Sequence, residues 1–184
     1  GMKKEKAESI WILFEPFAGY GFGKAHAACY ATIAFRTAYL KAHFPVEFMT
    51  AVLTAESRGS SGPIKDEKLT RAIEECRRMK IELLPPDLNV SGVEFMIEKG
   101  AIRFGLSAIK NVGTASIESI LKARKLGREF ISLADFCRRV DLSKVNSKTM
   151  ESLIKAGAMD RLGKRASMLS SLGKIMEESH RQQK

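Results

Sequence analysis

Residues 109–115 read IKNVGTA, and this short stretch decides how the second half of the chain is expected to fold. Apolar residues at helical spacing lie on both sides of it, ending at Val112 and resuming at Ile117. Gly113 stands between the two apolar sets, where a second helix would begin. The pattern predicts two helices joined by a tight turn.

The same turn has the chemistry of a phosphate-binding site. The first N–H groups of a helix have no partner within the helix, and glycine lets an anion come close to them because it has no Cβ. Lys110 adds positive charge, as do Lys122 and Arg124 further along. Asn111 stands at a turn position where a left-handed backbone is common, and asparagine tolerates that conformation. An ordinary helical hairpin with no ligand accounts for this pattern about equally well.

Residues 140–160 form a second candidate. They contain Lys144, Asn146 and Lys148, and then the run LIKAGA at 153–158. Asn146 or Ser147 is expected to cap a helix that ends at Gly157. The segment could be a degenerate second hairpin that packs on the first, although plain structural helices are the favoured interpretation.

The first part of the chain is predicted to be helical. A short helix is expected over residues 3–13 and ends before Pro16, and a glycine-aromatic loop follows at 17–23. A long, largely buried helix is expected from Lys24 to His43, and another begins at Pro45. Lys24 and His26 could hold a phosphate at the start of the long helix, but an aromatic-packed corner is the favoured interpretation.

The middle of the chain shows a linker and a small sheet. Residues 57–62 predict a flexible connection, and a helix is expected over 63–79. A strand at 81–84 and a hairpin around Lys99-Gly100 follow, and a last helix over 165–178 precedes a frayed tail. The expected divisions are residues 1–56, 57–92, 93–178 and 179–184.

Composition limits the class of protein. The 184 residues carry a net charge of +10, with 45% hydrophobic and 28% charged residues, as in globular proteins. No apolar run is long enough for a membrane span, and the lysine-rich start predicts no secretory signal. Residues 93–184 hold eighteen basic and ten acidic side chains, which favours a polyanionic partner or simply a basic surface.

Cysteine and histidine use argues against a disulfide framework and against a zinc site. Cys29, Cys76 and Cys137 are widely spaced and form no CxxC pair, so three small buried thiols in a reducing compartment are expected. The three histidines have no ligand spacing with one another or with the cysteines.

Long runs of residues carry a resemblance to a known family. They are FAGYGFGKAHAACYA at 17–31, TAYLKAHFPVEFM at 37–49, ECRRM at 75–79, LPPDLN at 84–89, IRFGL at 102–106, IKNVG at 109–113 and LIKAGAMD at 153–160. Over residues 5–175 the chain resembles the alpha subunits of bacterial DNA polymerase III, a C-family replicative polymerase. It departs from the family where Gly23 replaces asparagine and Ala25 replaces serine.

The resemblance implies a mainly α fold with a small β-hairpin: the end of the polymerase fingers, a connecting segment and a tandem helix-hairpin-helix module. It implies sequence-independent binding of duplex DNA in DNA replication. The implied DNA-binding residues are Lys110, Asn111, Val112, Gly113, Thr114, Lys144 and Lys148. Lys24 and His26 are implied to face the incoming nucleotide.

The family is a nucleotidyltransferase that uses magnesium on palm aspartates, which lie upstream of the fingers. This chain shows no such carboxylate cluster, so we expect no cofactor and no polymerase activity from it alone. Its expected partners are duplex DNA and the rest of the polymerase, in the bacterial cytoplasm, with no membrane. The family's clamp-binding peptide follows the last helix and is expected to be absent here.

Two other interpretations stay open. The chain could be a stand-alone helix-hairpin-helix protein of repair or recombination, although residues 1–56 would have no role in such a protein. Alternatively, residues 1–92 could serve only to pack on the missing palm. In that case an apolar patch formed by Trp11, Phe14, Phe17 and Phe22 would be exposed.

Overall fold

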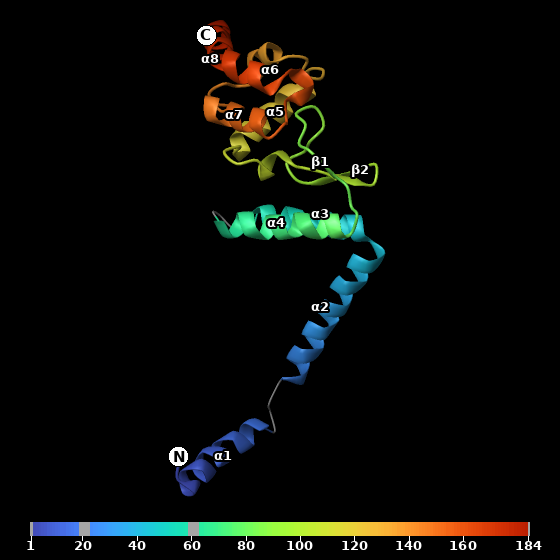
Figure 1. The fold of residues 1–184 in the computed structure, drawn as a ribbon, viewed down its shortest axis with the longest axis vertical. Coiled ribbons are helices and arrows are strands. Elements are labelled where there is room, and N and C mark those ends of the chain that lie inside the picture. Colours follow the sequence, from blue (N-terminus) through green and yellow to red (C-terminus); the bar gives the residue numbers. More distant parts are fainter. Residues whose placement is uncertain (1, 19–22, 59–62, 184) are drawn as a thin grey trace. The chain divides into compact units, whose positions relative to one another are not determined.

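The structure is a computed structural model that describes residues 2–18, 23–58 and 63–183. The chain divides into two compact units, Gly1–Phe44 and Pro45–Lys184. The architecture is mainly helical with one small sheet, as predicted (Figure 1). In the described part of the chain, no helix has the length and apolar character needed to cross a membrane.

The first unit contains two helices, α1 (Lys4–Ala18) and α2 (Lys24–His43). The prediction that the first helix ends before Pro16 is wrong, because α1 continues to Ala18. Proline removes one backbone hydrogen bond, and two further residues remain helical beyond it. The predicted glycine-aromatic loop lies mostly at residues 19–22, outside the described residues.

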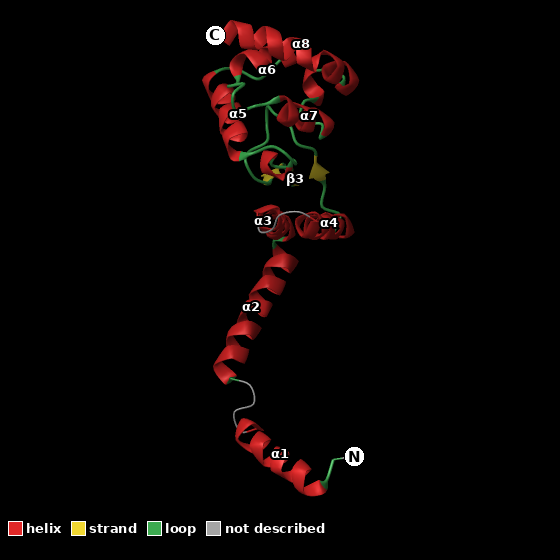
Figure 2. Ribbon diagram, turned by 90° about the vertical axis from the view of Figure 1, so that its left-hand side faces the viewer, coloured by secondary structure: helices red, strands yellow, loops and turns green. Residues whose placement is uncertain are grey.

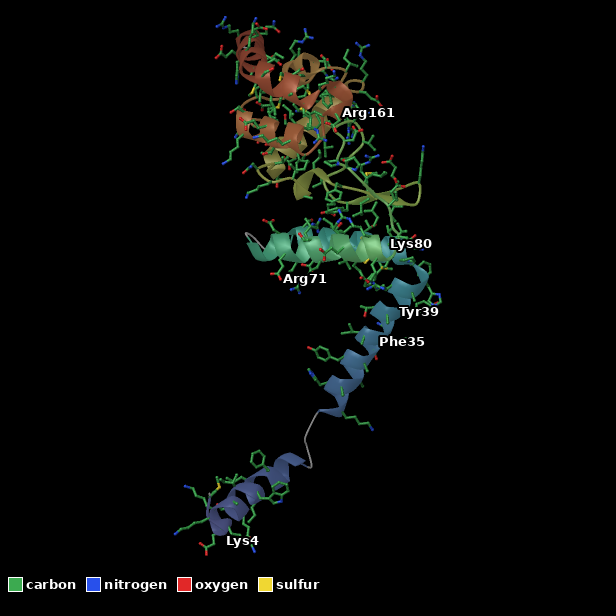
Figure 3. The ribbon with its side chains drawn as sticks, viewed as in Figure 1. Lys4, Phe35, Tyr39, Arg71, Lys80 and Arg161 are labelled. Carbon is green, nitrogen blue, oxygen red and sulfur yellow. The ribbon has the colours of Figure 1, made fainter. Side chains whose placement is uncertain are left out.

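Helix α2 has the predicted bounds, but the expectation that it is largely buried is wrong. None of its residues is buried, and Phe35 is 71% exposed. Phe35 and Tyr39 project from the helix (Figure 3). An apolar stripe becomes buried only where another element covers it, and within this unit α2 remains open. Trp11 and Phe14 of α1 are exposed in the same way, whereas Phe17 and Phe22 lie outside the described side chains.

The second unit begins with two helices that lie side by side, α3 (Pro45–Arg58) and α4 (Pro63–Arg78) (Figure 1). Proline opens both, because its fixed φ suits the first helical position and its missing N–H has no partner there. Their inward faces bury Met49, Leu53 and Cys76. Since α3 shares this core with α4, the division in the structure falls at residue 44 rather than near residue 56. The functional boundaries stay a prediction.

A three-stranded sheet covers the same core. Its strands are β1 (Leu83–Leu84), β2 (Met96–Glu98) and β3 (Ala101–Arg103), in the order β1-β3-β2. The predicted hairpin is present, and Lys99 and Gly100 have φ values of 52° and 84°, which a tight primed turn requires. The parallel pairing of β1 with β3 was not predicted, because no local pattern specifies which strand a short run will join.

The remaining elements surround a larger core (Figure 2). They are η1 (Leu106–Ala108), α5 (Thr114–Leu126), α6 (Leu133–Arg139), α7 (Ser147–Lys155), η2 (Asp160–Leu162) and α8 (Arg165–Gln183). The helix expected before the turn is replaced by the 3-10 turn η1. The tail expected to fray after residue 178 continues α8 instead, where Ser179 is 3% exposed.

The thiols differ from the prediction of three buried cysteines. Cys76 and Cys137 are buried, but Cys29 on α2 is exposed. Burial raises the pKa of Cys137 to about 11, because the thiolate loses its hydration there. Desolvation likewise raises the pKa of Cys76.

Close packing at Gly105 gives a test of the junction between the sheet and the helices. A Cβ at this position would lie 2.2 Å from the carbonyl carbon of Glu94, which is backbone and cannot turn away. We expect Gly105→Ala to lower the free energy of unfolding by about 1–3 kcal/mol, measured by urea denaturation. In contrast, Gly173→Ala on α8 meets no atom within 4 Å and should raise it by about 0.5–1 kcal/mol. Equal stability of the two variants would contradict the packing argument.

Candidate nucleic-acid interface

The N-terminus of α5 is the centre of the candidate interface. Gly113 is its N-cap residue, and no side chain caps the helix there. A Cβ at Gly113 would meet no atom within 4 Å, so the approach to the first turn is open. Thr114, the first helical residue, is exposed. The uncapped N–H groups carry the positive end of the helix dipole and suit an anion.

The turn before α5 is held in a left-handed conformation. Asn111 has a φ of 64°, as the sequence led us to expect for asparagine at this position. Val112 is 7% exposed, so its side chain anchors the turn in the core and only its backbone remains for a ligand. Lys110, directly before the turn, is exposed.

Helix α7 fastens this turn through two hydrogen bonds. The hydroxyl Oγ1 of Thr149 donates to the carbonyl oxygen of Asn111 at 2.9 Å. The amide Nδ2 of Asn111 donates to Oγ of Ser152 at 3.1 Å. The turn is therefore fixed by a helix that begins about 35 residues later in the chain.

The segment before α7 is tied to the first turn of α5. Oγ of Ser116 donates to the carbonyl oxygen of Lys144 at 2.6 Å. This contact and those at Asn111 place the start of α7 beside the start of α5. The structure thus gathers the seven residues expected to bind DNA: Lys110, Asn111, Val112, Gly113, Thr114, Lys144 and Lys148.

The two helix starts differ in availability. Asn146 caps α7, as predicted, by accepting a hydrogen bond from the backbone N–H of Thr149 at 2.9 Å. Because that N–H is occupied, the N-terminus of α7 is less free for an anion than that of α5. The ammonium of Lys144 lies 3.6 Å from the carboxylate of Asp141. The Ser143 hydroxyl and N–H, followed by Lys144, lower the pKa of the Asp141 carboxyl.

The end of α7 confirms the predicted glycine cap. Gly157 has a φ of 86°, and its N–H donates to the carbonyl oxygen of Ile154. The N–H of Ala158 donates to Leu153, which completes a Schellman motif. The chain then turns through η2 into α8, and α7 and α8 pack against each other as a second helical pair.

Arg124 has a different role from the one its sequence position indicated. Its guanidinium donates to the carbonyl oxygens of Leu88 and Ser91, both at 2.9 Å. Desolvation lowers its pKa, and Asp87 partly opposes this effect. Arg124 therefore stabilises the loop between β1 and β2 instead of adding to the surface charge. Its partners lie more than 30 residues away, so no local spacing could reveal them.

Lys24 and His26 lie in the other compact unit, at the start of α2. Both are exposed, and the ring of His26 contacts that of Tyr30 in a tilted arrangement, with centroids 4.3 Å apart. Their role toward a nucleotide stays a prediction. In the described residues, no group of three or more His, Cys, Asp or Glu side chains could hold a metal ion.

Comparison with known proteins identifies the segment. A helix-hairpin-helix motif family matches residues 80–168. The chain is 47% identical over 174 residues to DNA polymerase III subunit alpha of Vibrio cholerae, a match that covers 94% of this chain. It is 44% identical over 176 residues to that of Thermus aquaticus, which covers 96% of this chain. The match to the Escherichia coli protein is 44% over 179 residues, again 96% of this chain. The chain spans 14–15% of the length of these relatives.

The left-handed turn gives a prediction about stability. Asn111→Ala loses the bond to Ser152 and places alanine in a conformation that costs about 1–2 kcal/mol, so we expect a loss of about 2 kcal/mol in the free energy of unfolding. Asn111→Gly loses the same bond without the conformational cost and should lose less. Urea denaturation of both variants measures the difference. A glycine variant no more stable than the alanine variant would contradict the role assigned to the turn.

Proposed function

The chain belongs to the family of bacterial DNA polymerase III alpha subunits, and on that premise we propose that its helix-hairpin-helix segment binds duplex DNA without reading its sequence. The observation that carries the proposal is the uncapped N-terminus of α5, open at Gly113 and flanked by Lys110, within the matched residues 80–168. A phosphate group would complete this site.

The geometry supports a simple mechanism. A phosphate oxygen approaches Gly113, where no Cβ obstructs it, and accepts hydrogen bonds from the first N–H groups of α5. Lys110, Lys144 and Lys148 neutralise this phosphate and its neighbours. All these groups address the phosphate backbone, and contacts of that kind position a protein on DNA without reading bases.

The proposed role in the whole polymerase is to hold the duplex during DNA synthesis. The full-length enzyme is proposed to be a magnesium-dependent, DNA-directed polymerase of the bacterial cytoplasm, with its catalytic carboxylates outside this segment. The exposed apolar side chains of α1 and α2 support packing against the rest of that polymerase. Lys24 and His26 are proposed to face the incoming nucleotide, and the sliding clamp is a proposed partner of the intact enzyme.

A stand-alone repair protein with the same motif is the less favoured alternative. The relatives match 94–96% of the chain, so the similarity extends well beyond the helix-hairpin-helix residues 80–168. A free-standing binding module would share only the motif. The identity over the remaining residues therefore favours the polymerase.

Salt dependence tests the phosphate contacts. If three to five phosphates are neutralised, fluorescence anisotropy with labelled duplex should give a log–log slope of affinity against salt of about −3 to −4.5. Lys110→Ala should reduce the size of this slope by about 0.9, because one fewer counterion is released. The control Lys174→Ala, on the exposed side of α8, should leave the slope unchanged.

Gly113→Val in the same assay tests the open approach. The backbone there, with φ −85° and ψ 167°, is extended and accepts valine, so the variant should stay folded by circular dichroism. Its affinity for duplex should fall roughly tenfold, because the side chain blocks a phosphate that contributes a charge-assisted bond. Unchanged binding by a folded Gly113→Val protein would remove α5 from the interface.

The chain by itself is expected not to extend a primer. A primed template with magnesium and all four deoxynucleotides should show no incorporation above background, while the full-length polymerase in the same assay extends it. Incorporation by the purified chain would contradict the proposal that the catalytic carboxylates lie elsewhere.

A further inference from the structure

A cavity of about 1050 Å³ opens within the second unit, beside the turn that precedes α5. One wall comes from the end of α4 and the segment around β1. The other comes from the turn at Lys110 and Asn111 and from one side of α7. Its volume is slightly above the range of about 300–1,000 Å³ typical of ligand sites. We call it the α4–α7 groove.

The floor of the groove is apolar. Ile73, Leu83, Phe104 and Ala108 line it, and each is a half-buried residue that packs against the smaller core. Ile109 adds a further apolar wall. An apolar side chain that displaces water from this surface lowers the free energy of the complex.

The rim of the groove is positively charged. Arg77, Lys110 and Lys148 are exposed there, and none of them forms an ion pair within the described residues. The acidic side chains on the rim are Glu82 and Glu151, and Glu151 is already paired with Lys155 at 3.0 Å. Three unpaired cations therefore face a single unpaired carboxylate.

We propose that the α4–α7 groove is a docking site for an acidic, apolar peptide segment of a partner protein. Leucine or phenylalanine side chains of the segment would cover the floor, and its carboxylates would meet Arg77, Lys110 and Lys148. This arrangement would bury the apolar floor and neutralise the excess positive charge of the rim. A nucleic acid fits less well, because the floor offers one half-buried aromatic ring and no set of exposed rings on which bases could stack.

The docking site goes beyond the proposed function, and its existence does not depend on it. If both hold, they are linked, because Lys110 and Lys148 belong to the groove and also to the proposed DNA surface. A docked peptide would occupy these two cations and compete with duplex DNA. Arg77 lies outside the proposed DNA surface, so a substitution there should change peptide binding without changing DNA binding.

The test uses the full 184-residue chain and a fluorescein-labelled, blocked hexapeptide in which aspartate alternates with leucine and phenylalanine. Anisotropy in the absence of DNA should show saturable binding. Arg77→Glu should weaken it roughly tenfold, because one attraction becomes a repulsion. Lys174→Glu makes the same charge change on α8, outside the groove, and should alter the affinity less than twofold. A peptide with asparagine in place of aspartate should bind roughly tenfold more weakly.

Methyl NMR locates the bound peptide. With labelled isoleucines, the peptide should shift the signals of Ile73, Ile81 and Ile109, which line the groove, and leave unchanged those of Ile117 and Ile120, which are buried in the larger core and do not line it. Ala156→Trp, which fills the groove from the residue that follows α7, should abolish binding. Because Arg77→Glu changes an exposed side chain, it keeps the test decisive if the tryptophan variant fails to fold.

Three outcomes would overturn the proposal. One is equal affinity of Arg77→Glu and Lys174→Glu, and another is binding that leaves the groove methyl groups unshifted. The third is a shift of those methyl groups by duplex DNA but not by the peptide, which would assign the groove to nucleic acid. Loss of DNA binding in Gly113→Val with peptide binding intact would leave both proposals standing as separate sites.

Discussion

The hydrogen bonds between α7 and the turn at Asn111 are the constraint on which the candidate interface depends. Thr149 donates a hydrogen bond to the backbone carbonyl of Asn111, and the Asn111 side chain donates one to Ser152. They fix a left-handed residue that redirects the chain into α5. Without that direction Gly113 would not present uncapped N–H groups beside Lys110. A phosphate site made of backbone N–H groups has a defined geometry only when the surrounding segments fix the position of that backbone.

The same hydrogen bonds between α7 and the turn at Asn111 also shape the neighbouring groove. Asn111 and Ser152 both line it, so the contact that orders the DNA surface also forms one of its walls. The opposite wall belongs to α4 and β1, whose positions follow from the smaller core and from the parallel pairing with β3. Two surfaces with different proposed ligands therefore share one structural element, which makes competition between them a physical consequence of the fold.

Local patterns predicted much of the fold and of the candidate site. The primed turn at Lys99-Gly100, the Asn146 cap and the Gly157 C-terminus follow from conformations and hydrogen bonds within a few residues. The errors have a different origin. The burial expected for α2 and Cys29 depends on whether another element covers them. The carbonyl partners of Arg124 are distant in the sequence and come close to it only in the folded chain.

The sequence by itself determined the hairpin, the Asn146 cap and the Gly157 end of α7, the basic excess of residues 93–184 and, through long runs of similarity, the family. These depend on neighbouring residues or on the order of residues along the chain. Only the tertiary structure decided that Lys148 lines the same groove as Lys110, that Lys144 lies beside the first turn of α5, and that α7 is hydrogen-bonded to the turn at Asn111. It also decided that an apolar groove lies between α4 and α7. Such contacts join residues far apart in the sequence, and packing, not local periodicity, brings them together.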